Sequence, residues 1–265
     1  MIKTYCKIAW RNLAKNKLYT TLNVAGLTFG ITCFLLIGLF VFDELTFDQH
    51  HSKADRIYRV IEHKKVNGEA TIIAAAGYSL AEESKKKIAE IENTTRIARA
   101  GRANLVNPDN PVNFQETITV ANQGLLEIFD FPFIEGDARS ALKEPNSIII
   151  NEDLSRRLFG RTDVVGKTLK YNFLDAPLKI TGVFKNHPSN SSFDFNNVIS
   201  EGSMNWDIND WSSNNFSVYT LLKPHSNPVN VSDKLTKLVV DNIKPEVGTT
   251  YAFNLQPLQD IHLKS

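Results

Sequence analysis

Cysteine is scarce in this chain of 265 residues, which has only two, Cys6 and Cys33. Both precede residue 43, so the 223 residues from 43 to 265 can form no internal disulfide and must be stabilised by a hydrophobic core. A large excess of charge of one sign is also missing, since the formal net charge is +1. The chain therefore has no basic field that would attract a nucleic-acid backbone, and we expect no nucleic-acid partner.

Charge is absent altogether from one long segment, Leu22–Phe42, whose 21 residues are LNVAGLTFGITCFLLIGLFVF. As a helix this segment would be about 31 Å long, which matches a hydrocarbon core of ~30 Å. A signal peptide would have a shorter apolar region followed by a small-x-small cleavage site, whereas Phe40–Asp43 follows here. The segment therefore predicts a retained transmembrane helix rather than a buried core helix or a cleaved signal.

The two flanks of this segment differ in charge. Residues 1–21 contain five basic residues and no acidic residue, while Asp43, Glu44 and Asp48 follow the span. Lys and Arg are retained on the cytoplasmic side of membranes. The flanks therefore predict a cytoplasmic or interfacial segment 1–21, a transmembrane helix 22–42 and an exported body 43–265. In a Gram-negative cell this means the inner membrane and a periplasmic body.

The first of two candidate contact surfaces is basic. Lys3, Lys7, Arg11 and Lys15 recur every four residues, so on a helix they form one stripe. Such a stripe either meets anionic lipid headgroups at the membrane interface or only sets the topology, and the sequence leaves both open.

The second candidate surface lies inside the span. Asn23, Gly26 and Gly30 share one face of the expected helix, and the two glycines have GxxxG spacing. Small residues at this spacing permit close approach of a second helix, so these three residues are candidates for helix packing.

Motifs for catalysis, nucleotide binding and metal binding are lacking. The run Gly160–Thr168 resembles a phosphate-binding loop, but five residues separate its glycines instead of four, and a helix is expected before it where a strand is required. His50 and His51 lie near acidic residues, yet without HxxxH or HxH spacing they favour a solvated turn next to the membrane over a metal site. No nucleophile elbow occurs. We therefore expect no enzyme, no cofactor, and no catalytic or metal site.

Alternating patterns in the body predict an α+β architecture. Helices are expected near 77–91, 151–159 and 231–242, the second with Asn151 as its N-cap and Gly160 just past its end. Strands are expected near 56–62, 96–106, 116–121, 167–173, 178–184, 217–222 and 251–255, with loops over 186–215. This order predicts a split αβ subdomain, about 55–100 and 206–262, with an inserted β-rich subdomain, about 101–205.

A collinear series of short motifs runs through nearly the whole chain. It begins with Asn23-x-x-Gly26-Leu27-x-x-Gly30, Glu44-x-x-x-Asp48-x-x-His51 and Asp55-Arg56-Ile57-Tyr58-Arg59-Val60. It continues with Phe129-Asp130-Phe131-Pro132-Phe133, Val165-Gly166-Lys167-Thr168-Leu169 and Ile180-Thr181-Gly182-Val183-Phe184, and it ends with Leu255-Gln256-Pro257-Leu258. In this order the motifs resemble the N-terminal half of FtsX-like, MacB-type ABC-transporter permeases, from the first transmembrane helix through the periplasmic core domain.

The resemblance implies a permease subunit that pairs with a second protomer or half and with a cytoplasmic ATP-binding subunit. In that family, ATP-driven motion of the membrane helices is relayed to the periplasmic domain, for export or efflux of substrates such as antimicrobial peptides, antibiotics or lipoproteins. A periplasmic adaptor or an outer-membrane exit duct is a further candidate partner. Such permeases continue into more membrane helices, so this chain is expected to be a fragment that ends before the second one.

Two other functions fit the residues less well. A single-pass membrane-anchored binding or sensor domain would hold its ligand between the two subdomains, but a sensor needs an output domain and only 21 residues are expected on the cytoplasmic side. An anchored periplasmic hydrolase is disfavoured because catalytic motifs are lacking.

Overall fold

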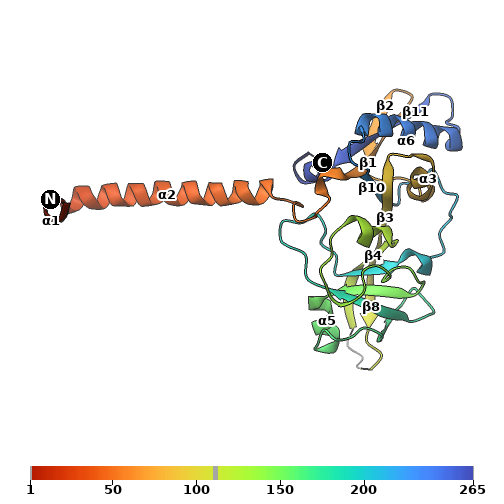
Figure 1. The fold of residues 1–265 in the computed structure, drawn as a ribbon, viewed down its shortest axis with the longest axis horizontal. Helices are drawn as coiled ribbons and strands as arrows, with labels where there is room; N and C mark the ends of the chain where they lie inside the picture. Colours follow the sequence, from red (N-terminus) through yellow and green to blue (C-terminus); the bar gives the residue numbers. More distant parts are fainter. Residues whose placement is uncertain (1, 110–112, 265) are drawn as a thin grey trace. The chain divides into compact units, whose positions relative to one another are not determined.

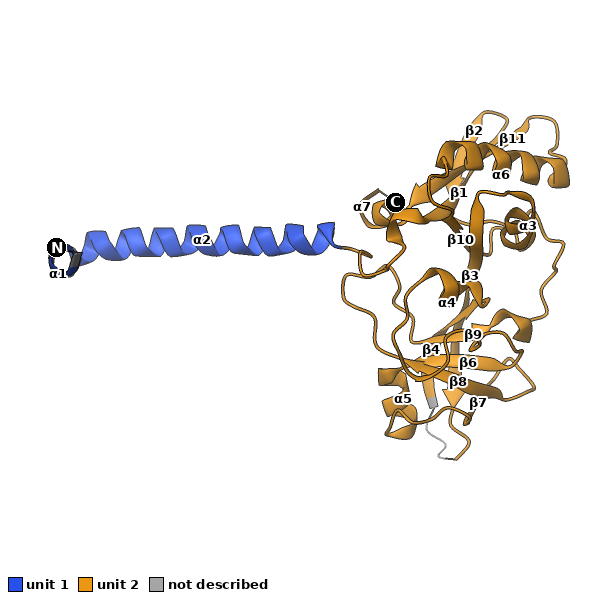
Figure 2. Ribbon diagram, viewed as in Figure 1, with its two compact units in different colours: residues 1–46 blue, residues 47–265 orange. Residues whose placement is uncertain are grey.

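The computed structural model describes residues 2–109 and 113–264. They form two compact units, residues 1–46 and residues 47–265, which are described separately (Figure 2). The first unit is helical. The second unit, here called the body, is a mixed sheet with helices packed against it.

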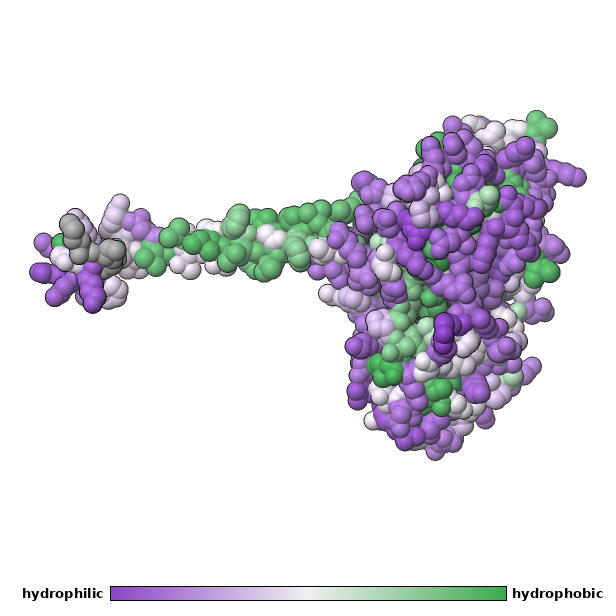
Figure 3. Space-filling model, viewed as in Figure 1, coloured by the Kyte–Doolittle hydropathy of each residue, from purple (hydrophilic) through white to green (hydrophobic). Residues whose placement is uncertain are grey.

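The first unit consists of helix α1, Ile2–Lys15, and helix α2, Lys17–Leu45. α2 has 29 residues, none of them buried, and is long and apolar enough to cross a membrane. Apolar side chains cover most of its visible side (Figure 3). The Thr28 hydroxyl donates to the Val24 carbonyl at 2.7 Å, so this polar group is satisfied inside the helix itself. The helix expected over 22–42 is therefore present, and it extends further at both ends.

The body is built on one sheet in the order β11-β1-β10-β3-β4-β9-β6-β8-β5, in which β2 also pairs with β1, and β7 pairs with β3 and β8 (Figure 1). Most neighbouring strands are antiparallel, whereas β4–β9 and β6–β8 are parallel. The strands are β1 Ile57–Val66, β2 Glu69–Ile73, β3 Ile91–Val106, β4 Asn113–Ala121, β5 Phe133–Gly136, β6 Ser147–Asn151, β7 Thr168–Tyr171, β8 Leu178–Phe184, β9 Asn197–Ser200, β10 Ser217–Leu222 and β11 Thr249–Pro257.

Strand β3 lies in the middle of the sheet and joins its two halves. Its first part pairs with β10 up to Ile97, and its second part pairs with β4 from Ile97 onward. A bulge between Arg99 and Arg102 interrupts the second pairing, and Gly101 within it has a φ of +83°. One continuous strand therefore joins the segments that the sequence divides into two subdomains. The boundaries near residues 101 and 205 stay a prediction.

Helices cover the sheet in two regions. Beside β1, β10 and β11, helices α3 (Ser79–Lys87) and α6 (Pro228–Ile243) bury Leu80 and Leu235 in one core. Beside β4, β6, β8 and β9, helices α4 (Gly124–Ile128) and α5 (Glu152–Phe159) bury Leu125 and Leu154 in two further cores. The expected α+β architecture is confirmed. The short helices are η1 Ala54–Arg56, η2 Glu201–Ser203, η3 Leu258–Asp260 and α7 Ile261–Lys264.

Helix α5 begins and ends as its sequence predicts. Asn151 Oδ1 accepts a hydrogen bond from the backbone N–H of Leu154 at 2.9 Å, and Gly160 has a φ of 72° just past the last turn. Because α5 precedes and β7 follows the glycine-containing loop, the run Gly160–Thr168 lacks the strand-to-helix order of a phosphate-binding loop.

Other local expectations were wrong. The helix expected over 77–91 ends at Lys87, because Ile88 turns to φ −111° and ψ 105° and Ile91 already belongs to β3. We predicted none of β2, β5, β6, β9 and α4, which have only four or five residues each. β9 even lies within the stretch 186–215 that we expected to be loop, and all four of its residues are buried. Elements this short leave no detectable period.

Candidate functional site

The residues that the sequence predicts to contact lipid or another helix all lie in the first unit and are exposed. α1 carries the four basic residues at a spacing of four, and α2 carries the asparagine and the two glycines of the packing face: Lys3, Lys7, Arg11, Lys15, Asn23, Gly26 and Gly30. A Cβ added to either glycine would meet nothing within 4 Å. Both surfaces are therefore open in the single chain, and the contacts we assign to them stay predictions.

A second region is apparent in the body. It comprises residues 47–56 and 258–264, here called the junction, where the first and last segments of the body meet. The Phe47 and His262 rings are stacked, with centroids 3.6 Å apart and planes at 5°. Helix η1 contacts η3, and Leu258 of η3 is fully buried in the hydrophobic core that also contains Phe129. Two segments far apart in the sequence are thus held together by direct packing.

Asp48 ties the junction to the loop before β9. It is 1% exposed and has a φ of 57°, a conformation that Asp tolerates better than most residues. Its backbone N–H donates to the Asn190 carbonyl at 2.9 Å, and its carboxylate accepts from both the backbone N–H and the hydroxyl of Ser192. This buried carboxylate is therefore a structural anchor.

The side chain of His51, a residue of the junction, lies in an aromatic cluster. The residue is 3% exposed, and its ring lies edge-on to Phe129 and Phe193, with centroids 5.1 and 5.9 Å away. Nδ1 accepts the backbone N–H of Asp130 at 3.1 Å, which places the ring proton of the neutral imidazole on Nε2. Burial, and secondarily the neighbouring His50, lowers the pKa of His51 to about 3. His51 is thus held neutral inside the fold.

This placement corrects the expected solvated turn. Asp48 and His51 are buried, although His50 beside them is exposed. A metal role gains no support, because the described residues contain no group of three or more His, Cys, Asp or Glu side chains arranged to hold an ion. The short sequence Asp48–His51 is therefore an anchor of the fold.

The depressed pKa of His51 predicts acid sensitivity. An unfolded histidine has a pKa of about 6.5, so protons bind the unfolded chain first as the pH falls. The contribution of His51 to stability is therefore fully present above pH 6.5 and is lost progressively toward pH 3. At pH 5 the loss should approach about 2 kcal/mol. Denaturant unfolding at several pH values should show a flatter pH dependence of the free energy of unfolding for the His51→Leu variant than for the parent chain.

Further contacts fix helix α4 and the residues after it to the junction. The backbone N–H of Ser52 donates to the Asp130 carboxylate, and Lys53 Nζ donates to the Glu127 carbonyl at 2.7 Å. Phe129, 2% exposed, lies between these contacts and also packs edge-on against Phe193 and Tyr219, with centroids 4.6 and 5.4 Å away. Phe129 therefore connects the junction to both β10 and the loop before β9.

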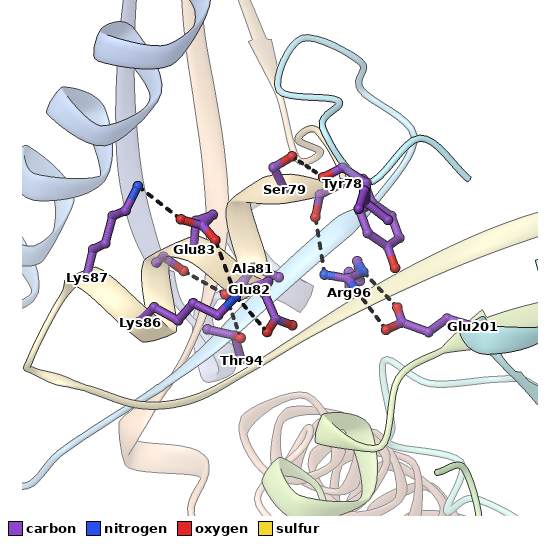
Figure 4. Close-up of polar contacts among 12 residues, drawn as sticks. Tyr78, Ser79, Ala81, Glu82, Glu83, Lys86, Lys87, Thr94, Arg96 and Glu201 are labelled. Atoms are coloured by element: carbon purple, nitrogen blue, oxygen red, sulfur yellow. Dashed lines mark hydrogen bonds and ion pairs between the residues drawn. The ribbon is translucent and has the colours of Figure 1, made fainter. Parts of the chain in front are cut away.

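A buried ion pair joins β3 to η2 (Figure 4). Arg96 of β3 is 3% exposed, and its Nε and Nη2 atoms each lie 2.7 Å from a carboxylate oxygen of Glu201. Its guanidinium stacks on the Tyr78 ring, 3.6 Å from the centroid, and Nη1 donates to the Tyr78 carbonyl. Burial raises the pKa of Glu201, while the charge of Arg96 opposes that rise. The pair links the segments 55–100 and 101–205 that the sequence assigned to different subdomains.

A polar cleft of about 640 Å³ adjoins this pair. Helix α3 contributes Glu82, Lys85 and Lys86 to its wall, and α4 contributes Glu127. Charges of both signs therefore line the cleft. Sequence reasoning missed both the cleft and the Arg96–Glu201 pair, because the two residues are 105 positions apart and no local pattern connects them.

Several solved structures share this fold. A domain assigned to a permease of Porphyromonas gingivalis aligns with a TM-score of 0.70 and 24% identity, over 78% of this chain and 91% of that one. The periplasmic region of MacB from Actinobacillus actinomycetemcomitans aligns with a TM-score of 0.50 and 14% identity, over 72% of this chain and 87% of that one. The extracellular domain of the noncanonic ABC-type transporter YknZ from Gram-positive bacteria aligns with a TM-score of 0.50 and 14% identity, over 72% of this chain and 98% of that one.

Sequence comparison reaches the same family. No curated protein matches the chain at a significant level. The sequence profile of the MacB-like periplasmic core domain matches residues 20–238, which is most of the chain. The chain therefore belongs to the MacB-like periplasmic core domain family of ABC-transporter permease proteins, a family of transport components and not of classical enzymes.

Proposed function

We propose that this chain is part of an ABC-transporter permease whose periplasmic body is moved by membrane helices that a cytoplasmic ATP-binding subunit drives. The observation that carries this proposal is the junction. The segment following α2 and the C-terminal segment pack on each other and on the core that contains Phe129. A displacement of either segment would therefore displace the body, because buried contacts join them to it.

Family membership supports the remaining parts of the proposal. The partners are the ATP-binding subunit and a second permease protomer or half, with a periplasmic adaptor or an outer-membrane duct as a further candidate. The transported substrates belong to the class of antimicrobial peptides, antibiotics or lipoproteins. The body is periplasmic, the membrane is the inner membrane, and residues 1–21 are cytoplasmic.

Co-purification from cells and export assays in a deletion strain test this proposal. The tagged protein, solubilised in mild detergent after cross-linking, should co-purify with an ATP-binding subunit, and deletion of the gene should reduce ATP-dependent export of at least one substrate class. A cross-linked preparation without any ATPase, together with unchanged export of all three classes, would contradict it.

A second candidate function is a membrane-anchored binding domain, which the mixed-charge cleft of about 640 Å³ favours. Such a domain would bind its ligand at that cleft without an ATPase. Co-purification of the ATPase therefore distinguishes the two functions, since only the permease requires it.

We also propose that Asn23, Gly26 and Gly30 pack against another membrane helix. Replacing both glycines with leucine should weaken assembly by about 1 kcal/mol, because the larger side chains separate the two backbones. Förster transfer between labelled full-length protomers in vesicles measures the effect. Gly38→Leu is the control, since Gly38 is also exposed on α2 but lies about 80° around the helix from Gly30. Equal transfer in all variants would contradict the packing face.

We further propose that the basic stripe sets the orientation of the chain in the membrane. Replacing Lys3, Lys7, Arg11 and Lys15 with glutamine should leave a mixed population of orientations, because the excess of positive charge on residues 1–21 falls from five to one. Protease added to spheroplasts should digest the body of the parent chain almost completely but leave a protected fraction of the variant. An unchanged digestion pattern would show that these residues do not set the topology.

A further inference from the structure

Three neighbouring strands of the body share one polar and aromatic face. Arg59 of β1 lies opposite Tyr219 of β10, and Ser217 of β10 lies opposite Ile97 of β3. Because side chains alternate along a strand, Ser217 and Tyr219 lie on the same face, as do Ile97 and Arg99. This face is separate from the mixed-charge cleft beside Glu201.

The segment before β9 covers this face and leaves a cleft of about 400 Å³. Phe193 and Phe195 of that segment, together with Ile97 and Tyr219 of the sheet, line the cleft with the small part of each side chain that is not buried in the core, at most 8%. Hydroxyl and amide groups lie at its border: Ser192, Asn214, Asn215 and Ser217. Apolar side chains and hydrogen-bonding groups that line one cleft of this volume together are features of small-molecule sites.

The charges on this cleft have one sign. Its wall includes Arg59 and Arg99 and, among the described residues, no carboxylate. The clefts beside Glu201 and Asp210 are instead lined by charges of both signs. Arg59 donates to the side-chain oxygen of Gln256 and so is held in place. Arg99 pairs with Asp194 outside the cleft, and both side chains of that pair are largely exposed, at 59% and 72%.

From this arrangement we propose that the cleft binds a small amphipathic carboxylate. The apolar part of the ligand packs on Phe193, Phe195 and Tyr219, and its carboxylate takes the place of Asp194 on Arg99. Arginine suits this role because its planar fork can donate two parallel hydrogen bonds to a carboxylate. The inference is independent of ATP-driven motion and goes beyond the proposed transport function.

Matched probes test the proposal on the full chain in nanodiscs of zwitterionic lipid. Indole-3-acetate and tryptamine carry the same ring with opposite charges, and inorganic phosphate carries charge without a ring. Isothermal titration calorimetry should detect binding of indole-3-acetate, at least tenfold weaker binding of tryptamine, and none of phosphate. Equal binding of the two indoles, binding of phosphate alone, or no binding of indole-3-acetate would each overturn the proposal.

Variants locate the site. Arg99→Gln should weaken indole-3-acetate binding by at least about tenfold, because the variant loses the charge-assisted hydrogen bonds to the carboxylate. Arg102→Gln on the same exposed bulge should leave binding unchanged. Asp194→Asn should tighten binding, because it removes the carboxylate that competes for Arg99. All three positions are exposed, so these substitutions remove no core packing, and a thermal melt of each variant checks that the fold is retained. Equal binding by the Arg99 and Arg102 variants would place the ligand elsewhere and overturn the assignment.

Discussion

Replacing Glu201 with alanine is expected to lower the free energy of unfolding by roughly 3–5 kcal/mol. The variant leaves the Arg96 guanidinium, 3% exposed, without its carboxylate, and a buried charge that loses its partner retains its full desolvation cost. Urea denaturation of the full chain in detergent, followed by tryptophan fluorescence, measures the change.

A second arginine of β3, Arg99, forms an exposed ion pair that serves as the control for loss of a carboxylate. Arg99 and Asp194 are 59% and 72% exposed, so Asp194→Ala should cost less than about 1 kcal/mol. The double variant Arg96→Met with Glu201→Leu should recover most of the loss, because it removes both buried charges and fills the same space. If Glu201→Ala cost no more than Asp194→Ala, the pair would not hold β3 to η2.

Phe129→Ala is expected to lower the free energy of unfolding by about 3–5 kcal/mol. The substitution opens a cavity where the Phe129 ring contacts His51, Phe193 and Tyr219. Phe173→Ala is the control for general effects of removing a ring, since Phe173 is 69% exposed and should change the stability by less than about 0.5 kcal/mol.

Hydrogen exchange separates a loss of the junction from a general loss of core packing. Phe184 is fully buried in the same core but packs against Phe131 and His187. In Phe129→Ala the amides of residues 48–54 should exchange faster, relative to the rest of the body, than they do in Phe184→Ala. Identical exchange patterns in these two variants would mean that Phe129 has no special connection with the junction.

The parts of the fold that the sequence predicts are those set by local chemistry. An uncharged run of helix length predicted α2, and Asn151 and Gly160 predicted the two ends of α5. Strands β8 and β10 have the predicted bounds because each is bordered by residues that interrupt the strand pattern.

The candidate sites depend on contacts that no local pattern encodes. His51 looks like a surface residue next to acidic side chains, and only the folding of residues 127–130 and 193 around it makes it a buried anchor. Arg96 meets Glu201, and Phe47 meets His262, only because the sheet brings distant segments together. The motif series could identify the family, but it could not indicate which of its residues touch.

We propose that the junction relays ATP-driven movement to the body. This relay can be followed by the distance between nitroxide labels on Lys170, an exposed position on β7, in two copies of the protein assembled with the ATP-binding subunit. We predict that ATP shifts the distance distribution measured by pulsed electron resonance, and that Phe129→Ala or His51→Leu reduces the shift while ATP is still hydrolysed. An unchanged distribution in the parent protein during active ATP hydrolysis would contradict the relay.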